Sequence, residues 1–286
     1  MVRSGEGRDG SETGGLGSAE PWRPCRLLTW TTDFGLVDAY VGTMHGVVLG
    51  RLPEARLVDL THGVPPQDVA AGALQLRHAW PYFPAGSVHV AVVDPGVGTE
   101  RAVLVGWQDG HAFVAPDNGL LAGALDPQRA IVHRVDPGLY GLDERSSTFH
   151  GRDVFAPLAA ALAGGVDPRS LGSPQPGWNR SAPARRTLHE WDGEGSVEAR
   201  VVLIDRFGNA ITDLEPGSRA PSLVGYSVQV MGRTIPLVDT YASAGPGAPL
   251  ALVDSWGHLE IAIRDGSAAQ SLGLAPGTTV TLRNPS

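Results

Sequence analysis

Short apolar runs alternate with amphipathic stretches through the first half of the chain. The apolar runs predict strands at 26–31, 55–60, 88–93, 102–106 and 112–115. The stretches between and after them predict helices over 37–49, 68–82 and 154–162. Strands and helices that alternate in this order predict an α/β domain over residues 25–171, with a mostly parallel central sheet.

The pattern changes after residue 171. Prolines, glycines and an acidic cluster interrupt the apolar periodicity over 172–195, which predicts a linker. Beyond it the apolar runs are short and no convincing helix stands between them, so residues 196–286 are predicted to form an all-β, barrel-like domain. The predicted strands lie at 197–204, 210–212, 226–230, 234–238, 250–253, 259–263 and 279–282. Residues 1–24 lack apolar periodicity and are predicted to be a disordered leader.

Composition narrows the class of protein. With 286 residues, 42% of them hydrophobic and 18% charged, the chain is long enough for one large or two medium domains with a sizeable core. A net charge of −8 argues against nucleic acid as the main partner. No apolar run approaches the ~20 residues that span a bilayer, so no membrane association is expected. Cys25 is the only cysteine, which excludes an internal disulfide and, without a signal-like start, favours the cytoplasm.

A glycine-rich turn follows the third apolar run, with the sequence Asp94-Pro95-Gly96-Val97-Gly98-Thr99-Glu100-Arg101. Asp94 is therefore expected at the carboxyl end of a strand, where open α/β sheets place their ligand crevices. Arg101, on the far side of the turn, is close enough to fold back and pair with Asp94. The pair is either a structural brace for the loop or part of a functional site, and the turn alone leaves both interpretations open.

Three further polar residues stand beside predicted helices. Asp33 lies where the first strand ends, and a helix cap is the structural alternative to a ligand contact. Asp38 is expected in the first helical turn, where it would complement the helix dipole. His150 precedes a helix and is a structural hydrogen-bonding residue unless it reaches Asp94 and Arg101.

Six sequence blocks, taken in order, resemble the S-adenosyl-L-methionine (SAM) hydrolases, also called SAM hydroxide adenosyltransferases, which are relatives of the SAM-dependent fluorinase and chlorinase. The blocks are Thr32-Asp33-Phe34-Gly35 with Asp38, Asp94-Pro95-Gly96-Val97-Gly98 with Arg101, Ala115-Pro116-Asp117-Asn118-Gly119-Leu120, Thr148-Phe149-His150-Gly151-Arg152-Asp153, Asp205-Arg206-Phe207-Gly208-Asn209 and Ser255-Trp256-Gly257. The resemblance covers about residues 26–285. It implies an α/β domain, a barrel-like domain, and a homotrimer whose substrate lies between the N-terminal domain of one subunit and the C-terminal domain of its neighbour.

The resemblance also implies catalytic roles. In the hydrolases an aspartate, an arginine and a histidine activate water, and these roles fall on Asp94, Arg101 and His150. The halogenases have a tyrosine at the position of Asp94 and no histidine equivalent to His150, which favours the hydrolase. Gly151 instead matches a glycine near the chlorinase halide site, so a halogenase is the alternative within the same fold.

The substrate-binding residues that the resemblance implies are Asp33, Asp38, Thr148, Gly151, Asp205, Asn209, Tyr241, Ser255 and Glu260. Asp33 would bind the ribose hydroxyls, and Thr148 would line the ribose and nucleophile pocket. Asp38 and Asp205 would face the methionine ammonium, with Glu260 as a further candidate. Asn209 would read the adenine edge while Tyr241 packs on the ring. Ser255 would hold the methionine carboxylate, although Trp256 replaces the arginine that follows this serine in the fluorinase.

The expected reaction needs a positioned water molecule rather than a cofactor. The sulfonium of SAM makes the ribose C5′ electrophilic, so water held in line with the C5′–S bond gives adenosine and L-methionine, and no metal is required. Two other classes stay open: a non-catalytic module that binds SAM or adenosine, and a metallohydrolase built from His62, Asp94, His150 and Asp33. No metal-ligand spacing in the sequence supports the second.

Overall fold

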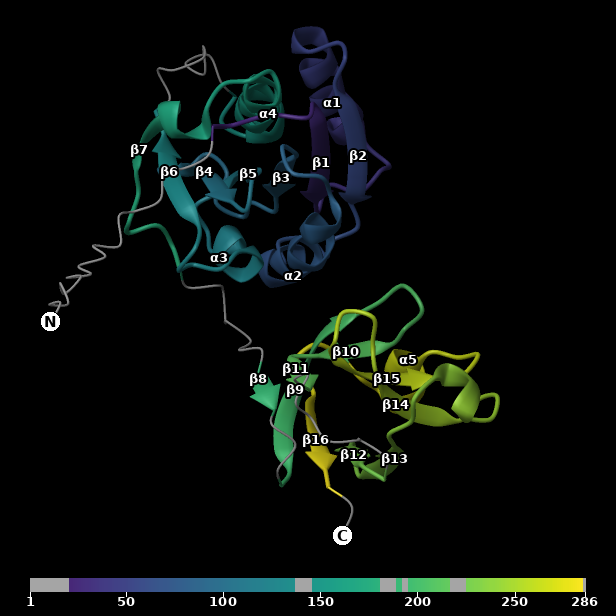
Figure 1. Ribbon diagram of the computed structural model, residues 1–286. Helices are drawn as coiled ribbons and strands as arrows, with labels where there is room; N and C mark the ends of the chain where they lie inside the picture. Colours follow the sequence, from purple (N-terminus) through teal and green to yellow (C-terminus); the bar gives the residue numbers. More distant parts are fainter. Residues whose placement is uncertain (1–20, 137–145, 181–188, 192–194, 217–224, 285–286) are drawn as a thin grey trace, which may run out of the picture.

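The computed structural model describes residues 21–136, 146–180, 189–191, 195–216 and 225–284, which form two sheet-based domains (Figure 1). The first domain is built on a seven-stranded sheet in the order β2-β1-β3-β5-β4-β6-β7. Its strands are β1 (Leu27–Thr32), β2 (Arg56–Thr61), β3 (Val88–Val92), β4 (Val103–Gln108), β5 (His111–Pro116), β6 (Ile131–Val135) and β7 (Gly172–Pro174). Helices α1 (Tyr40–Arg51) and α4 (Ala156–Ala163) cover one face, and α2 (Val69–Ala79) and α3 (Leu120–Ala124) cover the other.

The sheet is mixed. Among the described strands, β2–β1, β1–β3 and β3–β5 pair in parallel, whereas β5–β4, β4–β6 and β6–β7 pair antiparallel. The prediction of a mostly parallel sheet therefore holds for the half of the sheet that carries β1 and β3. The other half is antiparallel because β4 and β5 are joined by a tight turn at Asp109 and Gly110, both at positive φ, rather than by a crossover helix.

The helices differ from their predicted bounds. Helix α1 begins at Tyr40 and not at residue 37, because Gly35 adopts a φ of +66° and the chain turns before the helix starts. Asp38 therefore precedes the helix instead of lying in its first turn. Helix α2 ends at Ala79 and continues as a 3-10 turn, η1 (Trp80–Tyr82), with Pro81 in that turn. The predicted helix over 154–162 begins instead as a π-helical turn, η3 (Gly151–Phe155), which leads into α4.

Two segments at the predicted domain limits belong to the first domain. Trp22, near the end of the predicted leader, donates its indole N–H to the carbonyl of Leu162 at 2.9 Å and packs against Trp107. Strand β7, at the start of the predicted linker, pairs with β6 at the edge of the sheet. Residues 1–20 of the leader and 181–188 of the linker lie outside the described residues.

The second domain is a seven-stranded antiparallel sheet in the order β13-β12-β16-β9-β10-β15-β14. A bridge between Leu237 and Ala251 joins its two edges, so the sheet is nearly closed and barrel-like, as predicted. The strands of this sheet are β9 (Val197–Ile204), β10 (Ala210–Thr212), β12 (Ser227–Val230), β13 (Arg233–Pro236), β14 (Pro249–Val253), β15 (Leu259–Ile263) and β16 (Thr279–Arg283). Strands β8 (His189–Trp191) and β11 (Leu214–Pro216) form a separate parallel pair.

The expectation that no helix stands between these strands is wrong. Helix α5 (Ala268–Leu272) lies between β15 and β16, and two short 3-10 turns complete the described elements, η4 (Pro168–Ser170) and η5 (Tyr241–Ser243). Ser267 caps α5 by accepting the N–H of Gln270, and Gly273 ends the helix at a φ of +69°. Five residues are too few for a helical period to show in the sequence. Within the described part of the chain, no helix has both the length and the apolar character to cross a bilayer.

Candidate active site

Arg101 folds back onto Asp94 across the glycine-rich turn that follows β3. Its Nε donates to Asp94 Oδ1 at 2.8 Å, and its Nη2 donates to Asp94 Oδ2. The side chains of Arg101 and Asp94 are only 9% and 5% exposed. A buried bidentate pair of this kind fixes the plane of the guanidinium group, which also lies over the ring of Phe155 at 5.5 Å.

His150 completes the group through Arg101. The Nη2 of Arg101 also donates to Nδ1 of His150 at 2.8 Å. Because a guanidinium group can only donate, Nδ1 is the acceptor and the neutral ring carries its proton on Nε2. His150 therefore reaches Arg101, which stands between it and Asp94, and its functional role stays a prediction.

Glycine makes the close approach of these segments possible. Gly98 has a φ of +80°, and a Cβ there would lie 2.5 Å from the carbonyl oxygen of Ser147. The turn therefore packs directly on the segment that leads to His150. Gly151 is equally enclosed, because its Cβ would lie 2.8 Å from Met44 Sδ and 3.0 Å from the ring of Phe149. Glycine at position 151 therefore fits this close packing of side chains.

Two polar residues brace the neighbouring strand ends. Asp33 does not cap α1, whose cap position is Ala39; its Oδ2 accepts the N–H of Gln67 at 2.8 Å. Asn118 donates to the carbonyl of Val93 at 2.7 Å and accepts the N–H of Leu120 at 3.2 Å. Asn118 thereby holds the backbone next to Asp94. This positioning role was not predicted from the sequence.

The remaining predicted residues of the first domain lie on its surface. Asp38 and Thr148 are exposed, and Thr148 Oγ1 lies 3.1 Å from Ser146 Oγ. Beside them, the rings of Phe34, Tyr40 and Phe149 form a cluster with centroids 5.1–6.3 Å apart. We call these three residues the aromatic cluster.

A pocket of about 430 Å³ lies in the second domain. This volume is in the range of small-molecule sites. All of its described lining residues belong to that domain: Asp205, Phe207, Asn209, Ile211, Asp239, Thr240, Tyr241, Leu252, Val253, Asp254, Ser255, Trp256 and Glu260. The structure thus brings together the five residues of this domain that the sequence analysis named, and their roles toward a substrate stay predictions. We call this cavity the acidic pocket.

Carboxylates dominate the electrostatics of the acidic pocket. Glu260 is 3% exposed, so it is not a solvent-facing strand residue. Burial, together with the charges of Asp254 and Asp205, raises the pKa of Glu260 to about 7. The hydroxyl of Tyr241 donates to Glu260 at 2.6 Å, and burial, this hydrogen bond and the nearby negative charges raise the pKa of Tyr241. Such a pocket favours a cationic ligand.

Asp205 and Asn209 are held by a shared turn. Asp205 Oδ1 accepts the backbone N–H groups of Phe207 and Asn209, at 2.9 and 2.8 Å. Its Oδ2 accepts the side-chain amide of Asn209 at 3.0 Å. The amide of the buried Asn209 is therefore oriented before any ligand arrives.

Family models match both domains of the chain. The SAM hydroxide adenosyltransferase N-terminal domain matches residues 28–172, and the C-terminal domain matches residues 199–281. The chain belongs to the SAM hydroxide adenosyltransferase family.

Relatives of this chain include curated proteins and a solved structure. A protein of Thermus thermophilus named (R)-S-adenosyl-L-methionine hydrolase is 44% identical over 268 residues, which cover 90% of this chain and 99% of the relative. A more distant protein of an Actinoplanes species, named fluorinase, is 26% identical over 90% of this chain and 97% of its own length. A solved structure of an uncharacterised conserved protein from Thermotoga maritima matches with a TM-score of 0.80 and 30% identity, covering 90% of this chain and all of that one.

Trp256 has a structural partner on the first domain. Its ring stacks on His78 of α2, with centroids 4.8 Å apart and planes 2° from parallel. His78 Nε2 lies 2.9 Å from His258 Nε2, and Arg77 pairs with Glu215 at 3.2 Å, so the two domains meet here. Trp256 is therefore part of the contact between the domains.

The metallohydrolase alternative requires a group that the structure does not form. His62 lies with His45 and Asp59, whereas Asp94 and His150 hold Arg101. The sequence gives a weak indication that Asp59 and His62 lie close together, because they stand three residues apart where a strand ends. His45 has none, because α1 brings it there from a distant part of the chain.

Proposed function

We propose that this protein hydrolyses SAM to adenosine and L-methionine by attack of water on the ribose C5′. The observation that carries the proposal is the buried Arg101 guanidinium, fixed by Asp94 and hydrogen-bonded to His150. The Thermus thermophilus relative, with its name and 44% identity, supports the same reaction.

The reaction forms the O–C5′ bond as the C5′–S bond breaks, and the electron pair leaves with sulfur as a neutral thioether. Arg101 uses Nε and Nη2 for Asp94 and His150, and none of the contacts among the described residues engages Nη1. We assign the Nη1 donors to the attacking oxygen, where negative charge develops. The water proton passes to His150 Nδ1 when its bond to Arg101 opens. Asp94 orients Arg101, which in turn holds His150.

The acidic pocket would hold the cationic substrate. Asp205 and Glu260 suit the ammonium and sulfonium charges, Asn209 the adenine edge, and Tyr241 the face of the ring. Asp33 is placed at a strand end next to Gln67, where it can accept ribose hydroxyls. This chemistry needs no cofactor, since SAM supplies both the electrophile and the leaving group.

We call Asp94, Arg101 and His150 the Arg101 group. We infer a homotrimer in which the acidic pocket of one subunit closes over the Arg101 group of its neighbour, so that each subunit contributes one half-site to a shared site. Within the described chain the two half-sites lie on different domains, and apolar side chains are exposed at both. Leu36 and Val37, beside the aromatic cluster, are 75% and 99% exposed, and Phe207 at the acidic pocket is 77% exposed. Exposed apolar groups at both half-sites support burial against another copy.

The deciding experiment is turnover of SAM in ¹⁸O-water, with and without chloride or fluoride, followed by mass spectrometry. We expect ¹⁸O-labelled adenosine in amounts that halide does not change. A 5′-halo-adenosine product would overturn the hydrolase proposal and support a halogenase. The halogenase is the alternative because a relative named fluorinase is 26% identical to this chain. SAM retained without turnover would instead support the binding module.

The composite site has its own test. The assay is run at SAM concentrations well below KM, where Arg101→Ala inactivates the N-terminal half-site and Asn209→Ala lowers turnover about tenfold through weaker binding at the C-terminal one, so neither variant supports normal turnover alone. Co-expressed subunits of a randomly mixed trimer regain about a quarter of wild-type sites if each site uses two subunits. Co-expression that restores no activity would place both half-sites in one subunit.

A further inference from the structure

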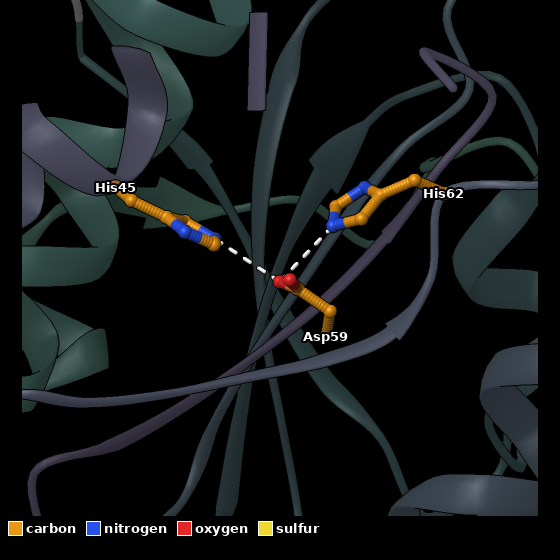
Figure 2. A group of neighbouring side chains, drawn as sticks. All are labelled: His45, Asp59 and His62. Carbon is orange, nitrogen blue, oxygen red and sulfur yellow. Dashed lines mark ion pairs between the residues drawn. The ribbon is translucent and has the colours of Figure 1, made fainter. Parts of the chain in front are cut away.

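We propose that His45, Asp59 and His62 form a binding site for a divalent transition-metal ion of the Zn²⁺ class. His45 comes from α1, Asp59 from the edge strand β2, and His62 from the loop that follows β2. Figure 2 shows the two imidazole rings approaching the Asp59 carboxylate from opposite sides. The group is separate from the Arg101 group and from the acidic pocket.

Three potential donor atoms converge. The Nε2 atoms of His45 and His62 lie 3.1 and 3.0 Å from the same atom, Oδ1 of Asp59. The donor atoms of all three residues lie within 4.8 Å of one another. Two imidazoles and one carboxylate make a ligand set that suits Zn²⁺, Co²⁺ or Ni²⁺, whereas Mg²⁺ and Ca²⁺ prefer oxygen alone.

The histidine nitrogens lack the hydrogen bonds that would make this an ordinary polar cluster. The side chain of His62 is 2% exposed, yet its Nε2 and that of His45 make no hydrogen bond. Both are at ion-pair distance from Asp59, but the ring N–H directions do not align with its oxygen. Buried ring nitrogens are normally paired, and a bound cation would accept both lone pairs.

Thr32 contacts the other ring nitrogen of His62 and is compatible with the tautomer that a metal needs. Its Oγ1 lies 2.8 Å from Nδ1 of the buried His62. A hydrogen bond from Nδ1–H to this oxygen leaves Nε2 with a free lone pair that faces Asp59. Outer contacts of this kind orient histidine ligands at metal sites.

The spacing between Asp59 and each of the two histidines requires only a small adjustment. Ligand distances of about 2.0–2.2 Å in tetrahedral geometry separate neighbouring donor atoms by about 3.4 Å. The observed 3.0 and 3.1 Å are a few tenths of an ångström shorter. Asp59 can supply this movement, because its side chain is 42% exposed on an edge strand. The same exposed side leaves a fourth position open to water.

The second His–carboxylate–His group of the described chain is a contrast. His258 Nδ1 lies 2.8 Å from the carbonyl oxygen of Thr212, so it donates, and its Nε2 pairs with His78 Nε2 at 2.9 Å. Glu215 is farther away, at 3.5 Å from His258, and pairs with Arg77. The facing ring nitrogens of this group already have partners, so it serves as a control.

The proposed ion would lie beneath the turn that carries Asp33. The carbonyl of His62 accepts the N–H of Gly35 at 2.8 Å, and Thr32 directly precedes Asp33. An ion that fixes the ring of His62 also restrains both ends of the Thr32–Gly35 segment. The site would act as a structural clamp and not as part of the reaction.

Binding of the metal alone tests the proposal. Tag-free protein is stripped with a chelator and titrated with Zn²⁺ against a chromophoric competitor, with Co²⁺ absorption as a probe of geometry. We expect one ion per chain, weakened at least about 100-fold by His62→Gln or Asp59→Asn and about 10–100-fold by Thr32→Val. His78→Gln is the matched control and leaves binding unchanged.

Two further measurements guard against misfolding and other ligands. His45→Gln alters a less buried ligand and should weaken Zn²⁺ binding while circular dichroism stays native. A Cys25→Ser background excludes the lone thiol. Wild-type protein that binds no Zn²⁺, or binding that His78→Gln abolishes and His62→Gln preserves, would overturn the proposal.

Discussion

The Arg101 group and the acidic pocket differ in whether their charges have partners within the protein. In the first, Asp94 and His150 each have a protein partner in Arg101, so the charges are balanced before any substrate arrives. In the second, Asp205, Asp254 and Glu260 face one cavity, and their crowding contributes to the raised pKa of Glu260. The balanced group suits a small neutral nucleophile, and the unbalanced pocket suits a cation. Substitutions in the first should therefore affect turnover, and substitutions in the second should affect binding.

The largest effect is expected from Arg101→Lys. Lysine keeps the positive charge but cannot donate to Asp94, His150 and water in one plane. We expect kcat to fall about 10²–10³-fold with little change in KM. Arg169→Lys is a matched control, because Arg169 makes a similar bidentate pair with Asp167 away from the site. Equal losses in both variants would mean that the pair serves stability only.

His150→Ala should lower kcat about 100-fold while SAM affinity changes only a few-fold. His150→Gln separates two roles, because a glutamine oxygen can accept from Arg101 but cannot carry the proton. Activity restored by glutamine would reduce His150 to a positioning residue. Single-turnover kinetics and equilibrium binding of SAM measure the two quantities.

Asn209→Ala tests the other side of the comparison. It removes a buried amide that Asp205 orients, so we expect SAM affinity to weaken about tenfold. The rate of the chemical step at saturating SAM should be nearly unchanged. A loss confined to the chemical step would place Asn209 beside the reacting atoms. It would contradict the assignment of turnover to the Arg101 group and of SAM binding to the acidic pocket.

Glu260 should give the smallest effect, visible in pH dependence. Burial raises its folded-state pKa from 4.5 to about 7, so the folded protein holds a proton there that the unfolded chain has lost. Stability should therefore fall as pH rises from about 4.5 to about 7, and level off above. Glu260→Gln should reduce this slope in thermal unfolding between pH 5 and 7.5. An unchanged slope would mean that Glu260 ionises normally.

The sequence alone determined that a domain of strands and helices precedes a barrel-like domain of antiparallel strands, and that Asp94 follows a strand. Apolar runs that end in glycine-rich turns mark β1 and β3 because a buried strand needs continuous apolar residues and its end needs a turn. The same local rules could not reveal that β4 turns back antiparallel, since β pairing depends on partners distant in the chain. They also missed α5, whose five residues are shorter than two helical turns.

The tertiary structure decided which residues meet. Asp94 and Arg101 are seven residues apart, so their pairing was predictable, but His150 reaches Arg101 only because Gly98 packs against Ser147. The pocket that gathers Asp205, Tyr241 and Glu260 depends on the closure of the barrel, and His45 joins Asp59 only because α1 packs beside β2. A sequence specifies side-chain chemistry and local backbone preference, whereas the pKa of Glu260 and the partner of each charged group follow from burial and distance, which only the folded chain sets.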